Sequence, residues 1–265
     1  MTARLLSAAV GIPLLLLVVW VQLPWLFTSV AALVAVVGAT EFARLFTRSG
    51  LAPKGWIAIP WAGALVVSGH VGGDALLAVT TAGLLLSLFA LLLQGGSPQE
   101  ALAQWGSTLG IALYLGWTLS HAPRLYALPQ GREWVLFWLF ATFATDTGAF
   151  FVGRLLGRHP LAPRISPNKT WEGAIGGWVA GVAAAAGLAW ALSLGIAWWE
   201  ALLLGAVVAV AGQLGDLFES LIKRGAQVKE AGSLVPGHGG LLDRLDSVVV
   251  TLPLVYYGVI ALTGG

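Results

Sequence analysis

The sequence predicts an all-α membrane protein, a polytopic bundle of about nine spanning helices with its N-terminus in the cytoplasm. Of its 265 residues, 58% are hydrophobic and only 10% are charged, and its mean hydropathy is +0.85. In a soluble domain about a quarter of the residues are charged. A chain of this length with so few charged side chains cannot cover a water-facing surface, and apolar runs of spanning length recur along it.

Nine stretches have the composition of a spanning helix, which needs about 20 mostly apolar residues. They are residues 5–22, 25–46, 55–72, 75–93, 102–121, 133–153, 174–194, 198–219 and 246–263. The first follows Arg4 and resembles a signal peptide, but its apolar run is long and no small-residue cleavage site follows. We therefore expect it to remain as an uncleaved span.

The basic residues set the expected orientation, because cytoplasmic loops carry an excess of Lys and Arg. With nine spans, all 14 Lys and Arg residues except Arg124 and Arg132 fall on the side of the N-terminus. This sorting places the N-terminus in the cytoplasm and the C-terminus on the far side. Adding or removing one span would break the sorting, which supports the number nine.

Glu41 is an acidic residue inside a predicted span of the N-terminal half. It lies three residues before Arg44 on the same helical face, which favours a local ion pair at the membrane interface. A functional role stays open, because ionisable groups inside membranes are costly.

Acidic residues also gather in the C-terminal half, on the predicted cytoplasmic side. Asp216 and Glu219 share one helical face, and Asp243 and Asp246 are likewise three apart at the start of the last span. Carboxylates grouped near hydrocarbon cannot all stay ionised without cations. Hard oxygen ligands favour Mg²⁺ over zinc, and the absence of cysteine excludes disulfides, thiolate metal sites and cysteine nucleophiles.

Each of these residues also has an ordinary structural explanation. Glu219 and Lys223 form an i,i+4 helix pair, Asp243 or Asp246 suits a helix N-terminus, and a lone His238 is more often structural. These explanations leave out the glycine-rich turn PGHGG, residues 236–240, which lies among the same charges. Such a turn permits close approach of a ligand, and its N–H groups suit phosphate. The chemistry predicts a Mg²⁺-dependent reaction on a phosphate-bearing substrate embedded in the membrane.

The stretch SLIKRGAQVKEAGSLVPGHGGLLDRLDS, residues 220–247, closely resembles the C-terminal motif of the phosphatidate cytidylyltransferases, or CDP-diacylglycerol synthases. The matching positions are Ser220, Lys223, Arg224, Lys229, Pro236, Gly237, His238, Gly239, Gly240, Asp243, Arg244 and Asp246. One position departs from the family pattern, since Glu230 stands where the family has Asp. Two further stretches, SPNKTWEG at 166–173 and TDTGAFFVGRLLG at 145–157, also resemble the family.

The resemblance implies transfer of the cytidylyl group of CTP to phosphatidate, giving CDP-diacylglycerol and pyrophosphate. It implies transmembrane helices over residues 1–132 and a catalytic transmembrane region over 133–265, with cytoplasmic loops at 154–173 and 220–245. It further implies a homodimer in the inner membrane with its active site open to the cytoplasm, and no nucleic-acid partner.

Roles for individual residues follow from the resemblance. The metal ligands are Asp216, Asp243 and Asp246, which hold Mg²⁺, and a second, monovalent cation is left open. The cations that neutralise the phosphates are Lys223, Arg224, Lys229 and Arg244, while His238 orients a phosphate rather than removing a proton. The substrate-binding residues are Ser166, Lys169, Thr170, Gly239 and Gly240, with Glu172 as a pocket acid or as a support for one. Asp146 either joins the metal or fixes a basic residue.

Three alternatives are weaker. CDP-alcohol phosphotransferases need Ala-Arg after their paired aspartates, and here Ser247 follows Asp246. A CTP-dependent polyprenol kinase uses similar chemistry and differs in its lipid product. A transporter would couple intramembrane acids to ions, but no internal repeat is visible and both polar clusters lie in the C-terminal half.

Overall fold

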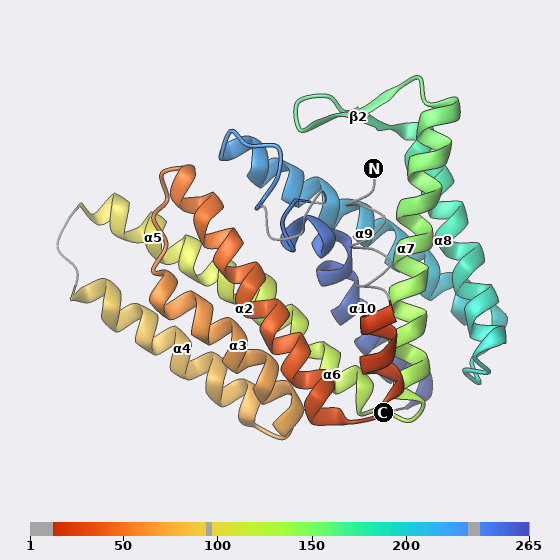
Figure 1. The fold of residues 1–265 in the computed structure, drawn as a ribbon, viewed down its shortest axis with the longest axis horizontal. Coiled ribbons are helices and arrows are strands. Elements are labelled where there is room, and N and C mark those ends of the chain that lie inside the picture. The colour runs from red at the N-terminus through yellow and green to blue at the C-terminus, as the bar shows by residue number, and fades with distance from the viewer. Residues whose placement is uncertain (1–12, 94–96, 233–238, 265) are drawn as a thin grey trace. The chain divides into compact units, whose positions relative to one another are not determined.

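The computed structural model describes residues 13–93, 97–232 and 239–264, which are helical almost throughout (Figure 1). The helices are α2 (Pro24–Arg48), α3 (Gly55–Val71), α4 (Ala75–Leu92), α5 (Pro98–Ile111), α6 (His121–Tyr126), α7 (Gly131–Leu156), α8 (Trp171–Ala191), α9 (Trp198–Gly225) and α10 (Asp246–Thr263). A π-helical turn, Ala112–Trp117, joins α5 to the segment before α6, and a 3₁₀ turn, Leu242–Arg244, precedes α10. The all-α prediction is confirmed.

Six of the described helices are long and apolar enough to cross a membrane, namely α2, α4, α7, α8, α9 and α10, and α3 is a shorter apolar helix. The polytopic architecture is therefore confirmed. The predicted span 102–121 corresponds to α5 and the π-helical turn, and the predicted span 5–22 begins outside the described residues. The number nine and the cytoplasmic N-terminus stay predictions.

The chain forms two compact units. The first runs to Ala127 and includes Ile222–Arg244, and the second comprises Leu128–Leu221 and the chain from Leu245 onward. The polar segment after α9 thus groups with the N-terminal helices, whereas the polar segment after α7 belongs to the second unit. α9 contributes residues to both.

In the first unit, α3 packs between α2 and α4. Trp61 of α3 is buried, and its Nε1–H donates to the carbonyl oxygen of Val79 at 3.1 Å, so the indole leaves no unpaired donor in the core. Gly83 of α4 lies against this indole, where a Cβ atom would overlap the ring.

In the second unit, α7 and α8 lie side by side (Figure 1) and pack together over an extensive contact. Small residues permit the close approach, as in many membrane helix pairs. A Cβ at Gly173 would come within 3.0 Å of the Cα of Gly153, and a Cβ at Gly177 within 2.7 Å of the Thr145 carbonyl oxygen. A buried hydrogen bond from Trp138 Nε1 to Thr251 Oγ1, 3.0 Å long, ties α7 to α10.

A short antiparallel hairpin follows α7, with strands β1 (Pro160–Ala162) and β2 (Ser166–Thr170) (Figure 1). Thr170 ends β2 and caps α8, because its Oγ1 accepts the backbone N–H of Gly173 at 3.1 Å. The predicted loop 154–173 is therefore the last turn of α7, this hairpin and the start of α8.

Candidate functional site

A pocket of about 420 Å³ lies in the second unit, between α7, α8, α9 and the hairpin. Its volume is in the range of small-molecule sites. The polar side chains that line it belong to Asp146, Arg154, Asn168, Lys169, Thr170, Gln213 and Asp216. Four of these carry charge, two of each sign, so the pocket suits a ligand with several anionic groups only if cations accompany it.

Lys169 and Asp216 form an ion pair inside this pocket. Lys169 Nζ lies 2.6 Å from Asp216 Oδ2. The ammonium nitrogen is shielded from solvent, and the geometry of this contact is that of an ion pair and not of a hydrogen bond. Lys169 comes from β2 and Asp216 from α9. The pair therefore fixes the hairpin against the helix and places both charges in one wall.

Three aspartates of the second unit lie near one another. Ser247 Oγ donates to Asp146 Oδ1 at 3.2 Å, and the backbone N–H of Ser247 donates to Asp246 Oδ1 at 2.8 Å. Asp146 is within electrostatic range of both Asp216 and Asp246. Gly215 lets the start of α10 approach α9, because a Cβ there would overlap the carbonyl oxygen of Asp246.

Whether a metal ion fits this site depends on the side-chain ligands that the described residues offer. Within the described ranges, no group of three or more Asp, Glu or His side chains stands ready to hold an ion. Mg²⁺ is commonly bound by one or two carboxylates with waters and substrate phosphates. The aspartates of the second unit fit that mode, in which the phosphates complete the coordination.

In the first unit, Asp243 organises the segment that follows α9. Its Oδ1 accepts from Lys223 Nζ at 2.7 Å, and its Oδ2 accepts the backbone N–H groups of Ala231 and Gly240 at 2.9 and 2.8 Å. Gly239 has a φ of +84°, which favours glycine. Lys223 and Asp243 are both largely buried. The pair therefore stabilises the conformation of the turn from its interior.

Glu41 also contacts this segment, and the expected ion pair with Arg44 is wrong. No ion pair joins these two residues, both of which lie in the described part of the chain. Instead Glu41 is 4% exposed, and its Oε2 accepts the backbone N–H of Leu242 at 2.8 Å. The feature of the sequence that could have indicated this hydrogen bond is the position of an acidic residue inside an apolar span.

The remaining predicted residues are placed as follows. Glu172 accepts the backbone N–H groups of Arg158 and His159 at 3.1 and 3.2 Å, and its Oε1 lies 2.5 Å from His159 Nδ1. It supports the start of the hairpin and does not line the pocket. Ser166 begins β2, and Arg244 ends the 3₁₀ turn.

Arg224 lies in the last turn of α9, with Lys229 beyond it. Gly240 follows Gly239 in the turn bound by Asp243. His238 lies outside the described residues.

Sequence reasoning assigned no role to three residues that line the pocket, Arg154, Asn168 and Gln213. Gln213 Nε2 donates to the carbonyl oxygen of Ala174 at 3.1 Å and so joins α9 to α8. Arg154 is the arginine of the Gly-Arg pair in one stretch that resembles the family, although no role was assigned to it, and Asn168 stands at a position that the other motif leaves open.

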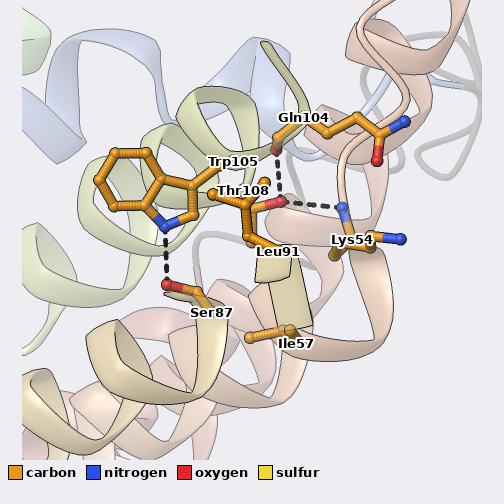
Figure 2. Close-up of a pocket in the computed structure, with 7 residues that line it drawn as sticks. All are labelled: Lys54, Ile57, Ser87, Leu91, Gln104, Trp105 and Thr108. Atoms are coloured by element: carbon orange, nitrogen blue, oxygen red, sulfur yellow. Dashed lines mark hydrogen bonds between the residues drawn. The ribbon is translucent and has the colours of Figure 1, made fainter. Parts of the chain in front are cut away.

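A second pocket, in the first unit, is a poor candidate for a substrate site (Figure 2). Its volume is about 10 Å³, room for one water. Thr108 Oγ1 accepts the backbone N–H of Lys54 and donates to the carbonyl oxygen of Gln104, and Trp105 Nε1 donates to Ser87 Oγ. These polar groups already pair with one another, so the pocket is a joint between α3, α4 and α5.

Comparison with known proteins places these residues in a family. A model described as the cytidylyltransferase family matches residues 2–262. The chain belongs to this family. It is 35% identical to a phosphatidate cytidylyltransferase of Synechocystis sp. over 98% of this chain and 97% of that protein.

Other relatives match mainly over part of their length. The chain is 44% identical to a phosphatidate cytidylyltransferase of Staphylococcus saprophyticus over 126 residues, and 40% identical to one of Bacillus subtilis over 147 residues. These matches span about half of each protein, 48% and 55% of the relative's length. The resemblance found in the motifs is thus confirmed at the level of the cytidylyltransferase family.

Proposed function

We propose that this member of the cytidylyltransferase family transfers the cytidylyl group of CTP to phosphatidate for phospholipid synthesis. The observation that carries the proposal is the pocket between α7, α8, α9 and the hairpin, which holds the Lys169–Asp216 pair in a family member with relatives named phosphatidate cytidylyltransferase. A pocket built on apolar helices suits the meeting of a water-soluble nucleotide with a lipid.

In the proposed reaction, a phosphate oxygen of phosphatidate attacks the α-phosphorus of CTP. A new phosphorus–oxygen bond forms, the bond from the α-phosphorus to the bridging oxygen of the β-phosphate breaks, and pyrophosphate leaves. The nucleophile is already ionised near neutral pH, so a strong general base is not required. Positioning and charge stabilisation then account for most of the rate enhancement.

Lys169 and Arg154 are the cations of the pocket, and we assign them to the phosphates that enter it. Arg suits bidentate contact with phosphate and Lys acts as a point charge. When phosphate approaches Lys169, the ammonium exchanges its contact with Asp216 for the ligand, which frees that carboxylate. Thr170 and Ser166 complete the nucleotide side, and Glu172 maintains the hairpin that presents them.

Mg²⁺ would be held by Asp216 and Asp246, with Asp243 as the third carboxylate. When bound there, the ion would neutralise charge on the reacting phosphates. Oδ2 of Asp243 already accepts two backbone N–H groups, whereas Oδ1 contacts Lys223. Asp146, which lies near two of the aspartates, either joins them at the metal or fixes a basic residue.

Lys223, Arg224, Lys229 and Arg244 are assigned to the triphosphate or the phosphatidate head group, with Gly239 and Gly240 offering backbone contacts and His238 orienting a phosphate. The protein is proposed to act as a homodimer in the inner membrane, with the site facing the cytoplasm. The predicted excess of Lys and Arg on that side supports this orientation.

The test is to incubate detergent-purified protein with α-labelled CTP, phosphatidate and Mg²⁺ and to measure label in CDP-diacylglycerol. The Asp216→Asn variant should lose this product, and Asp74→Asn, at an exposed aspartate before α4, is the matched control that should keep it. Transfer of label only from γ-labelled CTP would identify a lipid kinase and refute the proposal. Solute flux in proteoliposomes without CTP turnover would indicate a transporter.

A further inference from the structure

Glu41 is a buried carboxylate that the proposed reaction does not use. It lies in the second half of α2, is 4% exposed, and accepts the backbone N–H of Leu242, which is 201 positions away in the chain. Burying an ionised carboxylate costs several kcal/mol unless it is hydrogen-bonded. A leucine would pack in this helix at lower cost, so packing alone does not explain an acid here.

The segment that receives Glu41 is shaped around its carboxylate. A Cβ at Gly240 would lie 2.6 Å from Glu41 Oε2, and a Cβ at Gly232 would overlap Oε1. The absence of side chains at both glycines leaves the space that the carboxylate fills. At Gly232, the three atoms that a Cβ would lie nearest to all belong to Glu41.

The same few residues hold the proposed metal ligand Asp243. Gly240, which packs against Glu41, donates its N–H to Asp243 Oδ2, and Leu242, which donates to Glu41, is the residue before Asp243. Glu41 therefore contacts the backbone immediately before the position from which the Asp243 carboxylate projects. Movement of that backbone would also displace Lys223, whose ammonium is paired with Asp243.

We propose that Glu41 is a positioning residue that holds residues 240–242 so that Asp243 and Lys223 meet the substrates in the correct geometry. The inference rests on the proposed function, because it is that reaction which gives Asp243 and Lys223 their roles. Glu41 acts through this backbone and does not touch the reacting atoms. Misplacement of a group by about 1 Å costs on the order of a hundredfold in rate.

The first experiment compares Glu41→Gln and Glu41→Ala with Glu100→Gln, a control at an exposed glutamate in the first turn of α5. We expect kcat to fall between about tenfold and a hundredfold in Glu41→Ala, with less loss in Glu41→Gln, whose amide oxygen still accepts one N–H. KM for CTP should stay within about twofold because Glu41 does not contact the nucleotide. A kcat equal to wild type in Glu41→Ala would overturn the proposal.

A second experiment uses Gly232 to separate positioning from general instability. In the Glu41 background, Gly232→Ala should lower kcat, because its Cβ collides with the carboxylate. In the Glu41→Ala background the same change should lower kcat much less, since the three atoms nearest to the new Cβ are gone. Such non-additivity is the signature of direct contact. Equal losses in both backgrounds would refute the assignment.

The amide of Leu242 supplies a readout that is independent of activity. Its hydrogen exchange should accelerate in Glu41→Ala and remain unchanged in Glu100→Gln, whatever reaction the protein catalyses. If wild-type protein makes no CDP-diacylglycerol while exchange at Leu242 still accelerates in Glu41→Ala, the proposed function and the catalytic part of the inference are refuted, and a structural contact remains. Unchanged exchange at Leu242 would overturn the inference alone.

Discussion

Replacing Lys169 by methionine separates the two roles that the structure gives to this side chain. Lys169→Met keeps the stem and removes the charge that lies 2.6 Å from Asp216 Oδ2. The Lys169 and Asp216 side chains are 24% and 34% exposed, so water can replace part of the lost partner. Partly exposed ion pairs contribute up to about 1 kcal/mol to stability, and we expect a correspondingly small change in the thermal midpoint.

The effect on catalysis should be much larger. A charge-assisted hydrogen bond to phosphate is worth about 1.5–3 kcal/mol. Its loss lowers kcat/KM by roughly ten- to a hundredfold. Initial rates of CDP-diacylglycerol formation over a range of CTP concentrations measure this loss, and thermal unfolding in detergent measures the change in stability.

The matched control is Arg164→Met, which removes an exposed charge from the same hairpin at a residue that does not line the pocket. It should retain kcat/KM within about twofold, as expected for a screened surface charge. If Arg164→Met and Lys169→Met lose equal activity, the effect is a general attraction of the basic hairpin for anions. The reasoning from the Lys169–Asp216 contact would then be refuted.

Three further predictions concern packing and the metal. Gly177→Val should destabilise the α7–α8 pair by about 1–3 kcal/mol, since even a Cβ would lie 2.7 Å from the Thr145 carbonyl oxygen; a thermal midpoint at the wild-type value would contradict this. Thr251→Val should lower the free energy of unfolding by only about 1 kcal/mol, because Trp138 Nε1 keeps a second acceptor, the Val248 carbonyl oxygen at 3.3 Å. Chemical denaturation measures this change, and complete loss of folding would contradict the prediction. EDTA should abolish product formation and added Mg²⁺ restore it, whereas activity that persists in EDTA would exclude the proposed carboxylate-bound ion.

Composition was sufficient to predict the fold class. Long apolar stretches with few charges can be stable only as helices in a membrane, since every backbone group must be paired within its own segment. The predicted spans after the first therefore coincide with helices. Where the pattern was interrupted by polar residues, as at the hairpin of 160–170, periodicity gave no signal. The hairpin depends on Glu172 accepting amides more than ten residues upstream and on Thr170 capping α8.

The candidate site was predictable as a set of residues but not as a set of contacts. The motifs singled out Lys169 and Asp216, yet their pairing arises from the packing of β2 against α9, which no local pattern encodes. Glu41 is the clearest miss. Helical spacing favoured a partner on its own helix, but the hydrogen bond to the Leu242 amide satisfies a buried backbone donor, and this contact depends on tertiary folding.

The glycine contact between α7 and α8 bears on how this pocket can diversify during evolution. Gly153 and Gly173 line the pocket and at the same time pack against each other. A larger residue at either position would push the two helices apart before it reshaped the ligand space. Heritable changes in selectivity should therefore accumulate on the opposite walls, at Leu161 and Asn168 of the hairpin segment and Gln213 of α9, while the glycine wall stays constant.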